Sequence, residues 1–196
     1  MNRLVSELPR LTSVLIALSL AAALFSRLGY SHGALRPLLI SIYVNGNLPE
    51  IQAGQIWRLL TPIFIHFGLI HLVFNMLWLW DLGTAIERVR SSMLLGALVI
   101  VIGVTSNLAQ YIATGYPMFG GMSGVVYGLL GFIWMQGRFN RRFGLGLRKP
   151  IVIMMLAWFV LCWTGLVGPI ANVAHTAGLL IGVVWGITAA WFESRH

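Results

Sequence analysis

Four polar side chains carry the chemistry that this sequence can offer. Ser123 lies in the stretch GGMSGVVYGLLGF, where glycines on both sides leave its hydroxyl sterically open. His175 lies in a second apolar stretch, and His71 and Asn75 lie four residues apart in a third. A serine hydroxyl becomes a useful nucleophile when a base such as histidine stands beside it. The residue types therefore predict nucleophilic catalysis, provided that these distant stretches meet in the fold.

The same residues indicate where negative charge could be stabilised during such a reaction. A developing oxyanion needs hydrogen-bond donors aimed at it. His71 and Asn75 share one helix face, so that a ring N–H and a side-chain amide can converge. The backbone N–H of Ser123, at the start of a helix, adds a third donor. Tyr127, one helical turn after Ser123, can hold the imidazole of His175 by packing or through its hydroxyl.

No acidic residue is placed to complete a Ser-His-Asp triad. Asp81 follows His71 by ten residues, which puts it roughly 15 Å deeper along a helix. Only Glu50, in a loop, could approach the site, and no feature of the sequence indicates that it does. The sequence therefore favours a Ser123–His175 dyad. The full set of acidic residues is Glu7, Glu50, Asp81, Glu87 and Glu193.

The composition predicts lipid as the solvent for these residues. The chain has 196 residues, of which 58% are hydrophobic and 9% are charged, and its mean hydropathy is +0.85. A soluble domain has roughly 25% charged residues. The net charge of +8 could suit nucleic acid, but the basic residues lie in short clusters between apolar runs, so we exclude that partner. The single cysteine, Cys162, excludes an internal disulfide and is expected to be a packing residue.

Six apolar segments predict an all-α membrane protein with a single domain over residues 1–196. Each segment approaches the roughly 20 residues that cross a bilayer, although the fourth is short. Helices are required, because unpaired backbone groups are too costly in lipid and the segments lack the alternation of a barrel. A signal peptide at the first segment is the alternative, and five further spans make it the weaker one. The segments lie near 11–28, 68–87, 92–112, 122–137, 150–167 and 173–192.

The basic residues predict the orientation of these helices. With the N-terminus in the cytoplasm, three basic residues fall on the outer side: Arg27, Arg36 and Arg58. Ten fall on the inner side: Arg3, Arg10, Arg88, Arg90, Arg138, Arg141, Arg142, Arg148, Lys149 and Arg195. This asymmetry follows the positive-inside rule. The connection near 29–67 is long, which is typical of functional loops, and we expect part of it to lie in the membrane interface.

This orientation places the four polar residues at one depth. Helices two, four and six all begin on the outer side, near His71, Ser123 and His175. Ser123 and Arg138 are fifteen residues apart, or roughly 22 Å of helix, so Ser123 lies below the outer surface. The loop YPMFGG must descend to meet it, and such backbone is tolerated only where protein buries it or water lines it. We therefore expect a water-filled cavity that opens to the outside.

Three motifs resemble those of the rhomboid family of intramembrane serine proteases, and most resemble its bacterial GlpG type. They are HLVFN in the second helix, GMSGVVYG in the fourth and ANVAHTAGLLIG in the sixth. The likeness extends from the pair Trp57 and Arg58 to the last helix. It implies a six-transmembrane-helix rhomboid bundle with a membrane-embedded first outer loop. Some relatives of this type carry a small cytosolic domain ahead of the first helix, and we expect none here.

The resemblance also implies a role for each residue. Ser123 would be the nucleophile and His175 the general base. His71, Asn75 and the Ser123 amide would form the oxyanion hole. Further positions that match the family would stack on the base (Tyr127), support the structure (Arg58, Glu87) and form a lateral opening between helices two and five (Phe74, Trp158).

The function implied is cleavage of transmembrane segments of other membrane proteins. A bacterial inner membrane, with the site facing the periplasm, is the implied location. Neither a metal ion nor an organic cofactor is expected. The sequence does not indicate the oligomeric state.

Two other functions remain open from the residues. A rhomboid-like protein without catalytic activity could bind membrane segments and leave them uncut, although such a protein would be expected to lack Ser123 or His175. A metal transporter could use His66, His71 and His175. Zinc takes three or four ligands, often with a carboxylate or thiolate among them, and here the carboxylates lie at the wrong depth. By its spacing from His71, His66 is expected to be structural.

Overall fold

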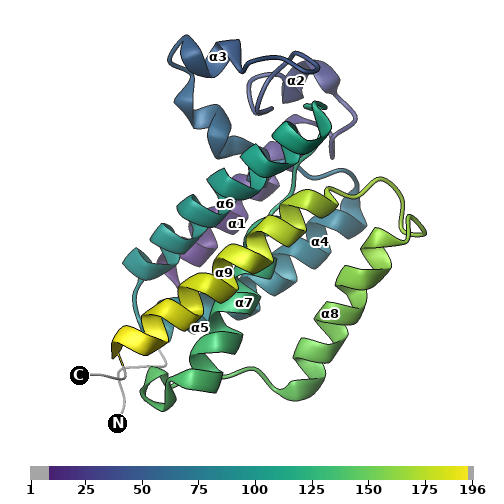
Figure 1. The fold of residues 1–196 in the computed structure, drawn as a ribbon. Coiled ribbons are helices and arrows are strands. Elements are labelled where there is room, and N and C mark those ends of the chain that lie inside the picture. Colours follow the sequence, from purple (N-terminus) through teal and green to yellow (C-terminus); the bar gives the residue numbers. More distant parts are fainter. Residues whose placement is uncertain (1–8, 194–196) are drawn as a thin grey trace.

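The computed structural model describes residues 9–193, and every regular element among them is a helix. Figure 1 shows the long helices with roughly aligned axes, and the short helices α2 and α3 lie at one end of the bundle. Helices occur in each of the six ranges expected from the sequence. They are α1 (Arg10–Phe25), α4 (Leu69–Trp78) with η3 (Leu79–Gly83) and α5 (Thr84–Val89), α6 (Ser92–Thr114), α7 (Ser123–Phe139), α8 (Lys149–Trp163) and α9 (Asn172–Glu193).

Three helical stretches in the described part of the chain are long and apolar enough to cross a membrane. They are Leu69–Val89, Ser92–Thr114 and Asn172–Glu193, and α1 and α8 are shorter apolar helices. The second helix is not uniform, because η3 is a π-helical turn between α4 and α5. The short α7 is the central helix, since every residue from Gly124 to Ile133 is buried. A helix that is covered by protein on all sides needs no apolar surface of its own for lipid.

Helices α7 and α9 pack backbone against backbone. A β-carbon added at Gly178 would lie 2.0 Å from the carbonyl oxygen of Gly124, and one added at Gly182 would lie 1.9 Å from that of Gly128. No side chain fits such a gap, so glycine is required at both positions. Small residues at this spacing let membrane helices approach closely. The contact fixes the N-terminal halves of α7 and α9 side by side.

The start of α1 and the C-terminal ends of α5, α7 and α9 meet at one end of the bundle. Glu87 of α5 accepts hydrogen bonds from the N–H groups of Leu11 (2.7 Å) and Thr12 (2.9 Å), and so caps the start of α1. At the end of α9, Glu193 pairs with Arg90 and accepts a hydrogen bond from Asn140, which follows α7. Basic residues expected in the cytoplasm, such as Arg90 and Arg142, therefore lie at this end. Two of them, Arg3 and Arg195, lie outside the described residues.

The long connection near 29–67 folds into four short helices at the other end (Figure 1). They are α2 (His32–Leu35), α3 (Pro49–Gln52), η1 (Ile56–Leu59) and η2 (Thr61–Phe64), and a further short turn, η4 (Arg141–Phe143), follows α7. Arg58, expected to be structural, is buried and donates to the carbonyl oxygens of Arg36 (2.6 Å) and Leu39 (2.7 Å). These charge-assisted hydrogen bonds hold the connection in one shape.

Glu50 holds the same connection from its other side. Its carboxylate accepts hydrogen bonds from the Ser41 hydroxyl (3.0 Å) and the Ile42 N–H (2.7 Å). Burial raises the pKa of Glu50. These hydrogen bonds and the charge of Arg58 lower it by a larger amount, so the pKa lies below its ordinary value. The carboxylate is thus engaged within the loop.

Candidate active site

Ser123 and His175 meet across the α7–α9 contact. The Oγ atom of Ser123 and the Nε2 atom of His175 are 2.7 Å apart, a hydrogen-bond distance. Ser123 is the first residue of α7, and His175 lies in the first turn of α9. His175 is buried, and its Nδ1 has no hydrogen-bond partner in the described part of the chain. The imidazole therefore contacts the serine with no carboxylate bonded to its other nitrogen among the described residues.

Two glycines let the chain reach Ser123 through a crowded space. Gly121 has a φ of +129°, which glycine adopts readily, and its N–H donates to the carbonyl oxygen of Pro62 (3.0 Å). A β-carbon at Gly120 would lie 2.7 Å from the same oxygen. The loop before α7 therefore presses against the end of η2. This contact brings the connection near 29–67 up to the serine.

His71 lies beside the serine with a defined hydrogen-bonding state. A β-carbon at Gly121 would be 2.8 Å from His71 Nε2 and 3.5 Å from Ser123 Oγ, so both atoms border one small space. The Phe67 N–H donates to His71 Nδ1 over 3.3 Å. Because Nδ1 accepts, a neutral ring carries its proton on Nε2. The ring thus presents an N–H group toward the space beside Ser123.

Asn75 lies one turn further along α4 and is buried. Its Nδ2 donates to the backbone carbonyl of His71 over 2.9 Å, which fixes the orientation of the amide. An amide nitrogen has two N–H groups, so one remains for another acceptor. His71 and Asn75 therefore lie on one face of α4, as their spacing predicted.

Tyr127 contacts the imidazole through its ring. The ring centroids of Tyr127 and His175 are 5.0 Å apart, with a tilt of 43°. The Tyr127 hydroxyl points elsewhere, since it donates to the carbonyl oxygen of Met155 in α8 over 3.3 Å. The sequence left packing and hydroxyl contact open, and the structure shows packing.

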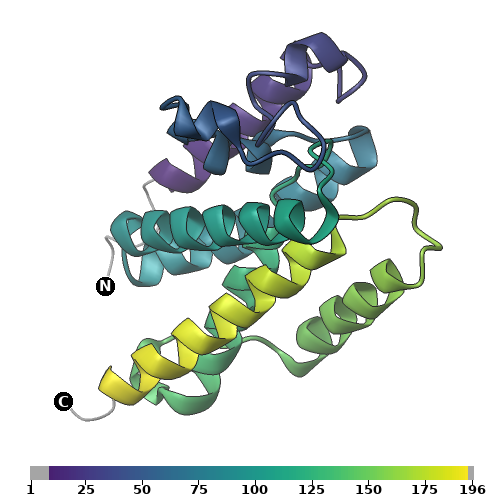
Figure 2. The ribbon, with the colours of Figure 1, turned by 45° about the horizontal axis from the view of Figure 1, so that its top comes forward.

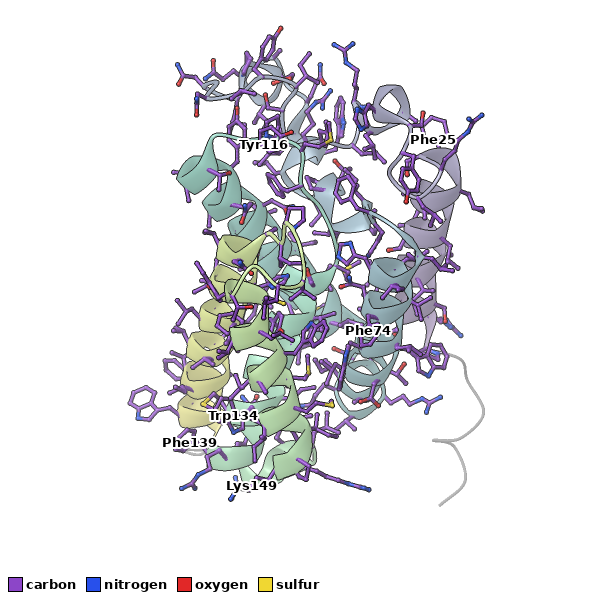
Figure 3. The ribbon with its side chains drawn as sticks, turned by 90° about the vertical axis from the view of Figure 1, so that its right-hand side faces the viewer. Phe25, Phe74, Tyr116, Trp134, Phe139 and Lys149 are labelled. Carbon is purple, nitrogen blue, oxygen red and sulfur yellow. The ribbon has the colours of Figure 1, made fainter. Side chains whose placement is uncertain are left out.

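Phe74 and Trp158 form the ring contact between α4 and α8. Their rings are stacked, with centroids 6.0 Å apart and planes 9° from parallel. About half of each side chain is exposed, 51% for Phe74 and 45% for Trp158. Figure 3 labels Phe74 on the side of α4 that is next to α8. The two rings therefore bridge α4 and α8 without being locked in the core.

Comparison with known proteins decides which family this arrangement belongs to. Residues 53–192 match the model of the rhomboid domain. The chain belongs to the rhomboid family. It is 39% identical over 132 residues to the rhomboid protease GlpG of Salmonella paratyphi A, and 40% identical over 132 residues to that of Salmonella choleraesuis. Each alignment covers 66% of this chain and 47% of the relative, so the chain spans about half the length of the curated relatives it matches.

The family and the apolar helices together make this rhomboid an integral membrane protein. The resemblance predicted from three short motifs is thereby confirmed. Among residues 9–193 no group of three or more His, Cys, Asp or Glu side chains is arranged to hold a metal ion.

Two further residues of this rhomboid lie close to the site. His66 is fully buried, and its ring centroid is 5.1 Å from that of His71. The spacing of five residues predicted that the two would not share a helix face, and they do not, because His66 precedes α4. Gln110 of α6 accepts a hydrogen bond from the N–H of Ala174 through its Oε1 (3.1 Å), next to His175. Its only signal in the sequence is a polar residue in an apolar segment.

Proposed function

We propose that this rhomboid is an intramembrane serine endopeptidase that cuts transmembrane segments of other membrane proteins. The observation that carries the proposal is the distance of 2.7 Å between Ser123 Oγ and His175 Nε2, both on the rigid α7–α9 pair. The matched relatives are named as rhomboid proteases, which supports the same activity. The match covers about half of their length.

The proposed reaction uses the dyad twice. His175 Nε2 takes the proton of the Ser123 hydroxyl while Oγ attacks the carbonyl carbon of the scissile peptide bond. The tetrahedral intermediate collapses when the imidazolium returns the proton to the leaving nitrogen, which releases the amine product and leaves an acyl-enzyme. A water molecule then gives a proton to His175 and attacks the ester. Collapse of the second intermediate returns the proton to Ser123 and frees the acid product.

Three donors would stabilise the oxyanion in both intermediates. They are the Nε2–H of His71, the free amide N–H of Asn75 and the backbone N–H of Ser123. The first two lie on one face of α4, and the third belongs to the start of α7, where it has no partner within the helix. We expect Asn75→Ala to lower kcat by about 10²–10³, as removal of one such donor does elsewhere.

We also propose a topology with six transmembrane helices in a single domain and the first outer connection embedded in the membrane. The N-terminus lies in the cytoplasm, and the site opens to the periplasm of a bacterial inner membrane. The shared end of α1, α5, α7 and α9 supports this, because its side chains include Arg90 and Arg138. A substrate helix hides its amides, so its upper part must unwind before it reaches Ser123 between α4 and α8.

The first test compares the wild type with Ser123→Ala and His175→Ala in liposomes. A fluorophosphonate probe should label wild-type Ser123, and a model transmembrane substrate should be cleaved. Both variants should lose labelling, and cleavage should fall by at least about 10⁴. Unchanged thermal unfolding of the variants shows that they are folded. A wild type that binds the segment but neither labels nor cleaves would make this chain a binding protein without catalytic activity.

A further inference from the structure

One acidic side chain of the membrane-spanning stretch plays no part in the mechanism. Asp81 lies in the π-helical turn η3, within the apolar stretch Leu69–Val89, and its side chain is exposed. It lies seven residues before Arg88, or about 10 Å from the end of the helix. No basic side chain among residues 9–193 lies within ion-pairing distance of it. An ionisable residue at such a depth is costly unless something pairs with it.

The surroundings of Asp81 show which way it faces. The opposite side of this helix is buried, through Leu79 and Leu82, and a β-carbon at Gly83 would lie 3.2 Å from Thr12 of α1. Asp81 instead lies at the end of a stripe of exposed residues that starts about two helical turns earlier, at Phe74. The stripe consists of Phe74 (51% exposed), Leu77 (63%), Trp80 (42%) and Asp81. Asp81 is thus on the same exposed face as the Phe74 ring that stacks on Trp158.

We propose that Asp81 determines specificity for substrates, by pairing with a lysine or arginine within their transmembrane segment. The proposal rests on the function proposed above, in which the substrate approaches between α4 and α8. A segment that lies there runs along the stripe, and its inner half passes Asp81. Basic residues gather at the cytoplasmic ends of transmembrane segments, and their long stems reach along the helix. Such an ion pair would lower the free-energy cost of both charges in the membrane, the carboxylate of Asp81 and the cation of the substrate.

The depth of Asp81 gives the position of the basic residue. Asp81 lies ten residues after His71, which borders the serine, so the separation along the helix is about 15 Å. A helical substrate covers this distance in about ten residues, and one that is partly extended near the cut needs fewer. The lysine or arginine should therefore lie about six to ten residues after the scissile bond. This position applies to a substrate whose C-terminal side faces the cytoplasm.

The test is a set of model substrates with one varied position. Lysine, glutamine or glutamate is placed at each position from four to twelve residues after the cut, and kcat/KM is measured in liposomes. The wild type should prefer lysine over glutamine about threefold to tenfold at the matching position, as polar contacts between membrane helices do elsewhere. Asp81→Asn should remove the preference, and Asp81→Lys should reverse it in favour of glutamate. A lysine two residues further along, on another face of the substrate helix, should have no effect.

The controls separate this inference from the proposed activity. Fluorophosphonate labelling of Ser123 should be equal in the wild type, Asp81→Asn and Asp81→Lys. If the wild type cleaves every substrate equally, or if Asp81→Asn slows all of them by the same factor, the inference is overturned and the protease assignment stands. If the wild type neither labels nor cleaves, the protease assignment fails. In that case the binding of lysine and glutamine segments is measured by fluorescence transfer. A preference for lysine in the wild type that is lost in Asp81→Asn would still support the role of Asp81, and equal binding would overturn it.

Discussion

The two sides of α7 are built in different ways. On one side α9 lies against it with backbone touching backbone, at Gly178 and Gly182. On the other side, α8 contacts the other helices through side chains. Figures 1 and 2 show α8 at the edge of the bundle, away from α6 and α1. Tyr127 of α7 meets Phe159 of α8 edge to face there. Next to it Phe74 of α4 stacks on Trp158 of α8, and both of these rings are half exposed.

This difference teaches how a rigid site and a route of access can occupy one small bundle. A dyad needs its two side chains held within a fraction of an ångström, and a backbone contact without side chains leaves no freedom to slide. A substrate helix needs space beside the dyad, and only a helix held by a few side chains can move aside. In the proposed function, the glycines therefore serve the chemistry and the aromatic pair serves substrate access.

The largest effect should come from breaking the rigid side. In Gly182→Ala the new methyl group would lie 1.9 Å from the carbonyl oxygen of Gly128, so α7 and α9 must part. We expect a loss of about 1–3 kcal/mol or more in the free energy of unfolding, as for other overpacked contacts. Labelling of Ser123 by fluorophosphonate should fall with it. Both are measured in detergent, by thermal unfolding and by probe incorporation.

A matched substitution controls for the change from glycine to alanine itself. A β-carbon at Gly33 meets no atom within 4 Å, so Gly33→Ala should leave both unfolding and labelling unchanged. Equal behaviour of the two variants would contradict the tight α7–α9 contact.

A smaller loss of stability should follow from removing the hydrogen bond between α6 and α9. Gln110 accepts a hydrogen bond from the N–H of Ala174, a group in the first turn of α9 that has no partner within the helix. Gln110→Ala leaves this N–H unpaired in a buried place, which costs about 1–3 kcal/mol of the free energy of unfolding. Thr105→Val is the control, because its hydroxyl donates to the carbonyl oxygens of Val101 and Ile102 in the same helix. If both variants unfold alike, Gln110 does not support α9.

Much of this architecture could be predicted from the sequence, since apolar runs and basic residues report directly on lipid contact. The family was predicted from three motifs, and helices occur in the expected ranges. The π-helical turn at Leu79–Gly83 could not be predicted, because one extra residue in an apolar helix leaves no break in the pattern. The contact between His66 and His71 was also missed, since it depends on the path of a loop. Loop paths follow from tertiary packing, which periodicity does not report.

On the side of α8, Trp158→Ala should change substrate access more than stability. Its ring is stacked on Phe74 but half exposed, so the loss should be about 0.5–1.5 kcal/mol, the worth of an aromatic pair. Cleavage of a transmembrane substrate should be maintained or rise several-fold, while labelling of Ser123 stays constant. Trp163→Ala removes an exposed ring from the end of the same helix and should change neither. A fall in cleavage with Trp158→Ala would assign the stack to the rigid site.

The smallest effect should come from Tyr127, the residue that touches both sides. Its ring packs on His175, while its hydroxyl donates to Met155 of α8 over 3.3 Å. Tyr127→Phe keeps the ring and removes one hydrogen bond, worth about 0.5–1.5 kcal/mol. If the ring alone serves the dyad, labelling of Ser123 should stay within about twofold of the wild type, a change of less than 0.5 kcal/mol. Tyr127→Leu, which removes the ring, should lower labelling well beyond that. Should Tyr127→Phe lower labelling as much as Tyr127→Leu, the hydroxyl bond to α8 would be part of the catalytic arrangement, and the separation between the two sides of α7 would not hold.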